Sequence, residues 1–255
     1  MLCGSAWSEY SVSDCKTGAT GEFRRITVPE SIAPLSTAIG VLGMPGMTAY
    51  FGTVDNLKVK AGDTLVVSGA AGAVGSLVAQ LGKVYGAHVI GIAGGKAKCQ
   101  HLQDDLGLDA VIDYKSHSTV ESIQAAIKQA APNGVDKYFD NTGGNETHAL
   151  WDLYNKYARV AICGQIAHYN STTPQKIDNF LMKTIYKHVT IEGFIYADYA
   201  YQPGRMDEFF NNVSKLIADG KVKYREHEVN GFESVPKAFI SLFHGANTGK
   251  IIVKC

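Results

Sequence analysis

Apolar residues through the middle of the chain switch between two kinds of spacing. Short apolar runs, typical of buried strands, alternate with stretches in which apolar residues recur at helical spacing. The runs predict strands over 64–68, 88–93, 110–113, 137–141, 159–163 and 189–194. The helical stretches predict helices over 73–85, 97–106, 119–130, 145–154 and 180–187. Such alternation predicts an α/β fold, a doubly wound six-stranded parallel sheet with helices on both faces.

Both ends of the chain depart from this alternation. Toward the N-terminus, 7–12 and 23–28 are typical of short strands or extended loops, 48–51 starts a helix, and 54–63 forms a turn. Toward the C-terminus the pattern predicts an amphipathic helix over 205–219, a strand over 224–229, a helix over 235–244 and a strand over 250–254. We expect this tail to return to a second, smaller lobe.

Composition narrows the possible partners. The 255 residues include 24 Lys and Arg against 24 Asp and Glu, so no charge bias favours nucleic acid or an anionic membrane. The five cysteines are scattered without a CxxC pair, and the eight histidines show no metal spacing. We therefore expect a cytoplasmic protein with reduced thiols and no metal, whose partners are neither nucleic acid nor membrane.

The most informative stretch is TLVVSGAAGAVGSLVAQLGKVY, from Thr64 to Tyr85. It orders a buried strand, a glycine-rich turn and a helix, which is how Rossmann folds hold the pyrophosphate of a dinucleotide at a helix N-terminus. Aligned to GxGxxG, Ala70 stands at the first position, while Gly72 and Gly75 fit. The alternative is an ordinary strand-to-helix turn in which small residues allow close packing.

The end of the second strand indicates which dinucleotide binds. An acidic residue that accepts from a ribose 2′-hydroxyl is expected about 20 residues after the glycines. Gly94-Gly95-Lys96-Ala97-Lys98 stands there instead, without a carboxylate. Because lysine is a common phosphate partner, this predicts NADP(H) rather than NAD(H). The alternative is that both lysines are solvated surface charges.

Polar residues also follow the next three predicted strands. Tyr114 follows the third, Asn141-Thr142-Gly143-Gly144 the fourth, and Cys163 to Asn170 the fifth. Parallel sheets bind ligands beyond the carboxyl ends of their strands, so these are ligand candidates. Each taken singly is equally typical of a turn residue that satisfies its own backbone.

Several motifs together resemble one family. GMPGMTAYFG, SGAAGAVGS, YFDNTGG, ICGQIAHYN, IEGF and HGANTGKIIV are similar to motifs of the zinc-independent medium-chain dehydrogenases/reductases. The similarity is greatest to the branch of prostaglandin reductases, leukotriene B4 12-hydroxydehydrogenases and alkenal double-bond reductases. It covers 40–255, and WSEYS at 7–11 resembles the family's catalytic lobe.

The resemblance implies a domain plan. The family's catalytic lobe is a partly open, GroES-like β-barrel, and most of its N-terminal part has no counterpart here. We expect 1–45 to be a remnant of that lobe, 46–220 an NADP-binding domain, and 221–255 the return to the lobe. The chain is then expected to be a fragment, a short isoform or an incomplete gene model. A homodimer that pairs the edge strand at 189–194 is also implied.

The resemblance implies a role for each matching position. Gly72, Ala73, Val74 and Gly75 would hold the pyrophosphate, Lys98 and Tyr114 the 2′-phosphate, and Asn141 the nicotinamide-side ribose or phosphate. Cys163, Gly164, Gln165, Ile166 and Tyr169 would line the cofactor. Thr48, Phe194, Ile195 and Tyr196 would face or flank the nicotinamide, and Asn247 would close over the cofactor.

The implied reaction is NADPH-dependent reduction of the carbon–carbon double bond of an α,β-unsaturated ketone or aldehyde. Hydride adds to the β-carbon, and Tyr186 matches a tyrosine that hydrogen-bonds the substrate carbonyl and stabilises the enolate. The alternative for Tyr186 is a packing residue. The alternatives for the function are quinone reduction, or a catalytically silent protein that binds NADP(H) or dimerises.

Overall fold

The structure is a computed structural model, and it describes residues 7–8, 28–173 and 180–255. The strands expected at 7–12 and 23–28 lie almost entirely outside these residues. No helix in the described ranges is both long enough and apolar enough to cross a membrane.

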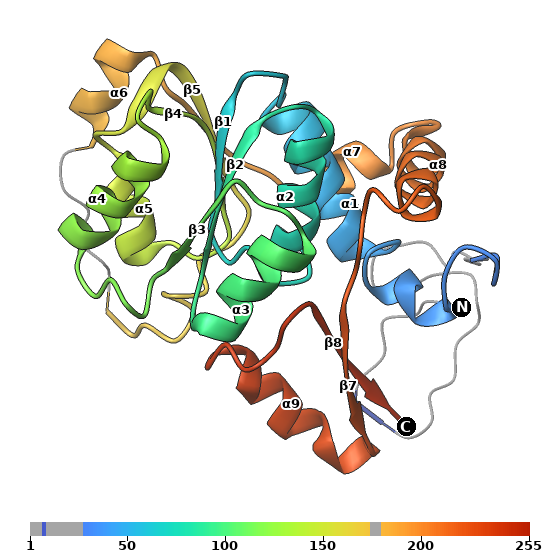
Figure 1. Cartoon of the computed structure of the whole chain (residues 1–255). Coiled ribbons are helices and arrows are strands. Elements are labelled where there is room, and N and C mark those ends of the chain that lie inside the picture. The colour runs from blue at the N-terminus through green and yellow to red at the C-terminus, as the bar shows by residue number, and fades with distance from the viewer. Residues whose placement is uncertain (1–6, 9–27, 174–179) are drawn as a thin grey trace.

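Six parallel strands form the central sheet in the order β3-β2-β1-β4-β5-β6 (Figure 1). They are β1 (Thr64–Val67), β2 (His88–Ala93), β3 (Ala110–Asp113), β4 (Val135–Asp140), β5 (Tyr154–Ile162) and β6 (Thr190–Gly193). The order reverses between β1 and β4, which is the crossover point at which doubly wound sheets bind ligands. The predicted α/β fold with its six-stranded sheet is confirmed.

Helices cover both faces of the sheet, and each face has its own core. The crossover helices are α2 (Gly75–Val84), α3 (Lys96–Gln100), α4 (Val120–Ala130), α5 (Gly144–Leu150) and α6 (Leu181–Lys187). A π-helical segment, η3 (His101–Asp105), continues α3. On one face α2 packs Leu77 and Leu81 against the sheet, and on the other α4 packs Ile123 and Ile127. All five predicted helices are present, with shifted ends.

The segment before the sheet is more helical than predicted. After the short η1 (Leu35–Ile39), α1 (Met44–Phe51) runs directly into the π-helical η2 (Gly52–Asn56), where a turn was expected from 54 onward. Gly52 lies so close to the sheet that an added Cβ would stand 2.5 Å from Phe139 and 2.6 Å from Phe194. Burial against those rings holds the extra turn of helix, although Asp55 and Asn56 gave the local sequence a loop-like composition.

The C-terminal part forms a separate small sheet. After α7 (Ala197–Ala200) and α8 (Arg205–Ala218), the strands β7 (Glu226–Asn230) and β8 (Lys250–Lys254) pair in parallel around η4 (Phe232–Ser234) and α9 (Val235–Leu242). Gly249, which precedes β8, bridges to Gly72, and its N–H donates to Ala71 O at 2.7 Å. The tail is therefore joined to the glycine turn, at the lower edge of the sheet in Figure 1.

Candidate functional site

The glycine turn lies at the carboxyl end of the central strand β1. Gly69 has a left-handed φ of +58°, which glycine adopts without strain. Gly75, the first residue of α2, packs so tightly that an added Cβ would overlap the Gly69 carbonyl oxygen. The Ala70 N–H donates to Ile92 O at 3.0 Å and ties the turn to β2. The alignment to GxGxxG missed Gly69, which provides the sharp bend one position before Ala70.

Between these glycines, the predicted pyrophosphate residues Gly72, Ala73 and Val74 lead into the first turn of α2. Gly72 N donates to Gly69 O, and Gly72 O in turn accepts from Ser76 N, each at 3.0 Å. A short turn with small side chains therefore sits at a helix N-terminus, which is an arrangement that suits an anion.

The residues after β4 are held against β1. The Asn141 side chain donates from Nδ2 to Ser68 O at 2.7 Å, and its backbone N–H donates to Ser68 Oγ at 2.9 Å. Asn141 was predicted to contact a ligand. One N–H of its side-chain amide joins the two central strands, so a ligand contact would use the second N–H or the oxygen of that amide.

The loop after β5 is anchored to the end of β4. The backbone N–H groups of Cys163 and Gly164 donate to Asp140 O at 2.9 and 3.0 Å. Gln165 donates from Nε2 to Asp140 Oδ2 at 2.9 Å, and its backbone N–H donates to the Tyr169 hydroxyl at 3.2 Å. Burial, with the Asp140 charge, raises the pKa of the Cys163 thiol to about 12, so this thiol stays protonated at neutral pH.

Ile166 and Tyr169 lie on the outer side of this loop and are exposed. A methyl group added to Gly164 would meet the Tyr169 hydroxyl at 3.0 Å, so the tyrosine folds back over the glycine. The structure therefore brings the predicted residues of 163–169 together at one edge of the sheet.

Asp140 is the residue of this edge that sequence reasoning missed. Its fully buried carboxylate accepts hydrogen bonds from six donors. The donors are Ser68 Oγ, Tyr138 Oη, Thr142 N, Gly143 N, Thr147 Oγ1 and Gln165 Nε2, at 2.7 to 3.2 Å. A charged residue that ends a buried strand just before a polar, glycine-containing turn was the available signal.

A second cluster lies at the carboxyl ends of β2 and β3. The Tyr114 ring covers Gly94, where an added Cβ would stand 2.6 Å from its hydroxyl. A methyl group added at Gly245 would lie 3.6 Å from Lys98 Nζ and 3.9 Å from Tyr114 Oη. Lys98 and Tyr114, which were predicted from the sequence, thus meet beside Gly245. Gly245 was not predicted to belong to the site.

This corner carries charges of both signs: Lys98 is a cation, while burial and the charges of Glu146 and Asp113 raise the pKa of Tyr114. Burial and the nearby Lys115 lower the pKa of Lys98, and no carboxylate of the described chain contributes to that pKa. The nearest carboxylate of the β3 end, Asp113, accepts instead from the N–H groups of Gly95 and Lys115, at 2.8 and 2.9 Å. A half-buried ammonium group beside a tyrosine hydroxyl is a suitable partner for a phosphate.

Phe194, Ile195 and Tyr196 follow β6 and differ in what they face. Phe194 is 8 % exposed, and its ring packs edge-on against Phe139 and Tyr199, so only its backbone is available to a ligand. Ile195 is exposed. Tyr196 is half-buried; burial and the neighbouring Tyr201 raise the pKa of its phenol.

The remaining two cofactor candidates use their side chains internally. Thr48, on α1, donates from Oγ1 to Met44 O at 2.9 Å and is buried. Asn247 donates from Nδ2 to Gly249 O at 2.7 Å, which shapes the loop that reaches the glycine turn. Both bonds therefore help to shape the site, and the Asn247 amide has a second N–H beyond the one in this bond.

Tyr186 lies at the opposite end of the sheet. It belongs to α6, whose Lys187 Nζ donates to the carbonyl oxygen of Tyr154, the first residue of β5, at 2.7 Å. Figure 1 shows α6 at the upper edge of the sheet, away from the tail that meets the glycine turn. Tyr186 is also 75 % exposed in the chain. Within the described chain, Tyr186 therefore lies away from the glycine turn, and its catalytic role stays a prediction.

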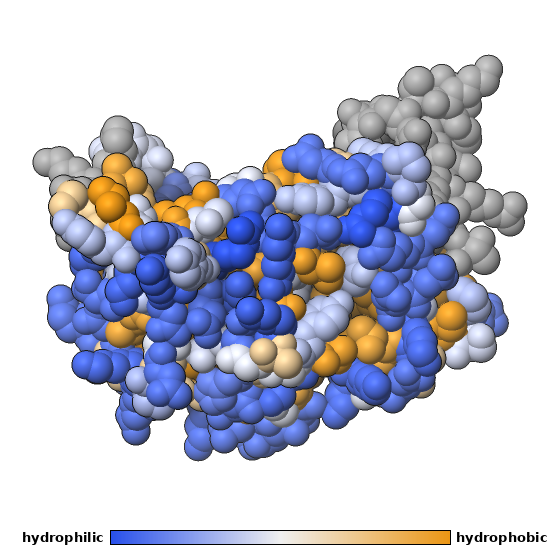
Figure 2. Space-filling model, turned by 90° about the horizontal axis from the view of Figure 1, so that it is seen from above, coloured by the Kyte–Doolittle hydropathy of each residue, from blue (hydrophilic) through white to orange (hydrophobic). Residues whose placement is uncertain are grey.

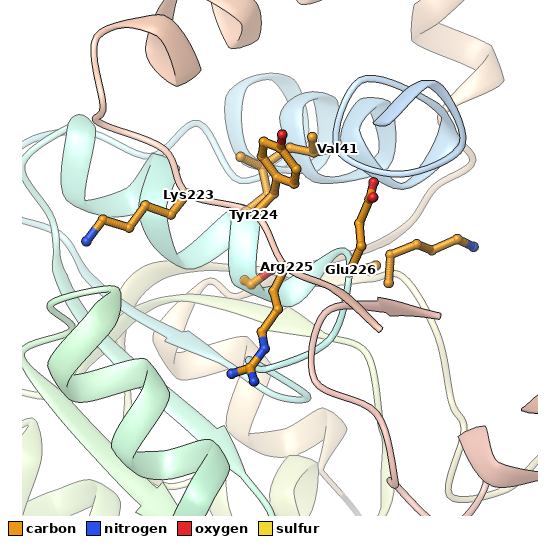
Figure 3. A pocket seen from close by; sticks show the side chains of 9 residues that line it. Val41, Lys223, Tyr224, Arg225 and Glu226 are labelled. Carbon is orange, nitrogen blue, oxygen red and sulfur yellow. The ribbon is translucent and has the colours of Figure 1, made fainter. Parts of the chain in front are cut away.

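A small pocket opens beside the N-terminal end of α2, between α2 and the segment that leads into β7 (Figure 3). Val41, Lys223, Tyr224, Arg225 and Glu226 line it, together with Ala73 and Lys250 among others. Its free space fits little more than a water molecule. It is therefore not the site that the predicted residues define.

No group of three or more His, Cys, Asp and Glu residues that could hold a metal ion occurs within the described ranges. The fold and the two clusters define a Rossmann-type nucleotide-binding protein.

The comparisons with known proteins agree. The model of the zinc-binding dehydrogenase family matches residues 73–215. A putative NADP-dependent oxidoreductase, YfmJ of Bacillus subtilis, is 41% identical over 254 residues, covering 98% of this chain and 70% of the relative. Prostaglandin reductase 1 of Bos taurus is 41% identical over 254 residues, covering 100% of this chain and 74% of that relative.

Among solved structures, CurA of Vibrio vulnificus in complex with NADPH superposes with a TM-score of 0.85 at 40% identity, covering 98% of this chain and 72% of that one. The chain therefore belongs to the zinc-binding dehydrogenase family, in its zinc-independent, prostaglandin reductase-like branch, and it is an oxidoreductase.

Proposed function

We propose that the protein reduces the carbon–carbon double bond of α,β-unsaturated ketones or aldehydes with NADPH. The choice of cofactor rests on the corner formed by Lys98, Tyr114 and Gly245, which offers a cation and a hydroxyl. A carboxylate at this position would instead select NAD(H). Relatives named prostaglandin reductase and NADPH-dependent curcumin reductase, at about 40% identity, support the choice of reaction.

The residues present fit this cofactor. The turn from Gly69 to Gly75 carries no side chain larger than valine, and Gly94 leaves room for Tyr114. Lys98 would hold the 2′-phosphate, and the loops after β4 and β5 would line the nicotinamide half. When bound, the reduced nicotinamide supplies the hydride.

The chain itself must stabilise the negative charge that develops on the carbonyl oxygen. A fixed phenol is suited to this, and removing one such donor typically costs ~3 kcal/mol in the transition state. Since Tyr186 lies at the other end of the sheet, we assign the role to Tyr196. It follows β6 at the same edge as Gly164, because Ile162 pairs with Gly193. Its raised pKa keeps the proton on the phenol.

The test follows loss of reduced-nicotinamide absorbance when the full chain is mixed with NADPH and a simple enone. Oxidation with an enone, but not with a quinone, supports the proposal. Faster oxidation with the quinone favours quinone reduction. Tight NADPH binding without oxidation of either shows a catalytically silent nucleotide-binding protein.

Two matched variants separate the tyrosines. Tyr196→Phe is expected to lower kcat about a hundredfold with little change in NADPH binding, whereas Tyr186→Phe leaves kcat within about twofold. A large loss of kcat in Tyr186→Phe alone would instead assign the enolate-stabilising role to Tyr186.

We also propose the domain plan given by the resemblance, with 46–220 as the nucleotide-binding domain and 1–45 and 221–255 as parts of the catalytic lobe. The separate β7–β8 sheet supports this division.

We further propose a homodimer through β6. Its outer edge is unpaired among the described strands, and exposed apolar side chains of α6 lie next to it, seen at the left of Figure 2. Light scattering of the purified chain tests this, with dimer mass as the expected result.

A further inference from the structure

Two buried carboxyl groups lie behind the candidate site. Asp140 ends β4 and is fully buried, and Glu146 lies in the first turn of α5 and is 6 % exposed. The Thr142 hydroxyl donates to Glu146 Oε2. No cation of the described chain contributes to the pKa of Glu146. In a buried carboxyl pair near a ligand site, one group can gain or lose a proton when the ligand binds.

The two carboxyl groups are held in different ways. Asp140 accepts hydrogen bonds from six donors. Glu146 accepts from the Thr142 hydroxyl. Burial raises the pKa of Glu146 to about 7, the Asp140 charge adds to this, and the Thr142 hydroxyl opposes it. Glu146 is therefore the member of the pair that titrates near neutral pH.

The surroundings of Glu146 link it to the phosphate corner. Burial, with the charges of Asp140 and Glu146, raises the pKa of Tyr138 on β4. Burial, with the charges of Glu146 and Asp113, raises the pKa of Tyr114, which follows β3. From α4, the polar side chain that reaches α5 is the uncharged Gln124, whose Nε2 donates to Ala149 O. From the loop after β5, His168 Nε2 accepts from Gly144 N at 3.2 Å. Through Thr142, Glu146 is thus attached to the turn after β4, at the same carboxyl end of the parallel sheet as Tyr114 and Lys98.

We propose that Glu146 couples binding of the phosphorylated dinucleotide to uptake of a proton by the protein. Its protonated form is compatible with a phosphate beside Tyr114, and its ionised form adds a second negative charge, beside that of Asp140, to a region that must accept an anion. The inference rests on the proposed function, because it requires NADPH to bind at this edge. A bound phosphate stabilises the protonated carboxyl, so the affinity for NADPH falls as pH rises through neutrality.

Calorimetry of NADPH binding to the full chain, in two buffers of different ionisation enthalpy, measures the proton uptake directly. The 2′-phosphate also titrates, so the informative quantity is the difference between wild type and Glu146→Gln. Near neutral pH the variant is expected to take up about half a proton less. Between about pH 6 and pH 8, the affinity of wild type for NADPH should fall by a factor roughly ten times larger than the affinity of the variant does. Glu121→Gln, an exposed carboxylate on α4, is the matched control and should behave as wild type.

Equal proton uptake in wild type and Glu146→Gln overturns the inference while leaving the proposed function intact. Absence of NADPH binding by wild type overturns the proposed function, and this inference with it. If Glu146→Gln does not fold, Thr142→Val carries the test. It keeps the carboxyl but removes the hydroxyl that lowers its pKa, so the pH of maximal proton uptake should move upward. An unmoved maximum would contradict the role of Glu146.

Discussion

The two ends of the central sheet have opposite character. At the carboxyl end, polar side chains are buried and bonded to one another: Asp140 collects six hydrogen bonds, and Asn141 joins β4 to β1. At the amino end of β5, α6 exposes Leu181, Met182, Ile185 and Tyr186 to solvent. Buried polar groups are tolerated only when they are hydrogen-bonded, so the carboxyl end is an organised polar site, whereas the amino end exposes apolar side chains.

The difference bears on which of two tyrosines can act at the carboxyl end. Tyr186 and Tyr196 are ten positions apart in the chain, yet α6 and the end of β6 lie at opposite edges of the sheet. Polar residues gather where strands end, and a parallel sheet fixes which residues those are. The four substitutions below test whether the carboxyl end has the organisation described, from the largest expected effect to the smallest.

Asp140→Ala is expected to have the largest effect. It removes the acceptor for six donors and leaves several of them buried without a partner, which should lower the free energy of unfolding by ~4 kcal/mol. Asp104→Ala, an exposed aspartate, is the control and should change it by less than about 0.5 kcal/mol. Urea denaturation of both variants measures the difference, and equal stability would show that the six bonds do not organise this edge.

Glu146→Gln is expected to change how stability depends on pH. In wild type, the folded chain keeps a proton on Glu146 that the unfolded chain releases between about pH 4.5 and pH 7. The free energy of unfolding should therefore fall by ~3 kcal/mol across that interval because of this group, and stay low above it. Glutamine does not titrate, so the variant should lack this fall. Denaturation curves at a series of pH values measure it, and parallel pH profiles would refute the raised pKa.

Gly75→Ala tests the close packing of the glycine turn. The added methyl group must displace the Gly69 carbonyl, which should lower stability by ~2 kcal/mol and weaken NADPH binding. Gly193→Ala is the matched control, because nothing lies within 4 Å of its added Cβ and its φ is not left-handed. Melting temperatures and NADPH titrations of the pair provide the comparison. A variant at position 75 that matches its control would mean that the turn is loosely packed.

Lys98→Ala should have the smallest effect on the fold and a selective effect on the ligand. Loss of one charged hydrogen bond is expected to raise the Kd for NADPH about tenfold and leave the Kd for NADH unchanged. Lys96→Ala, at the exposed neighbouring lysine, should affect neither. Fluorescence titrations with both dinucleotides measure this. Equal losses for NADPH and NADH would remove Lys98 from recognition of the 2′-phosphate.

Much of the fold could be predicted because its signals are local. Apolar runs such as Leu65 to Val67 identify buried strands, and their alternation with helices fixes the architecture. The η2 helix was missed because Asp55 and Asn56 are typical of a loop, and contact between Gly52 and Phe139 overrides them. The early start of β5 was missed because Asn155 and Lys156 are polar.

The candidate site was predictable in part for the same reason. Lys98 and Tyr114 follow strands whose ends must meet, so the sequence places them at one edge. Gly245 reaches that corner from a distant part of the chain, and the burial of Glu146 depends on how α5 packs, so neither is visible in a local pattern. Tyr186 was assigned from a motif alone, without a strand end to place it.

The central claim is that the carboxyl edge of this sheet binds a dinucleotide through its 2′-phosphate. Calorimetric titration of the full chain with NADPH and, separately, with NADH tests it most directly. We predict one site per chain and an affinity for NADPH at least about tenfold greater than that for NADH. Equal affinities, or no heat with either dinucleotide, would contradict the claim.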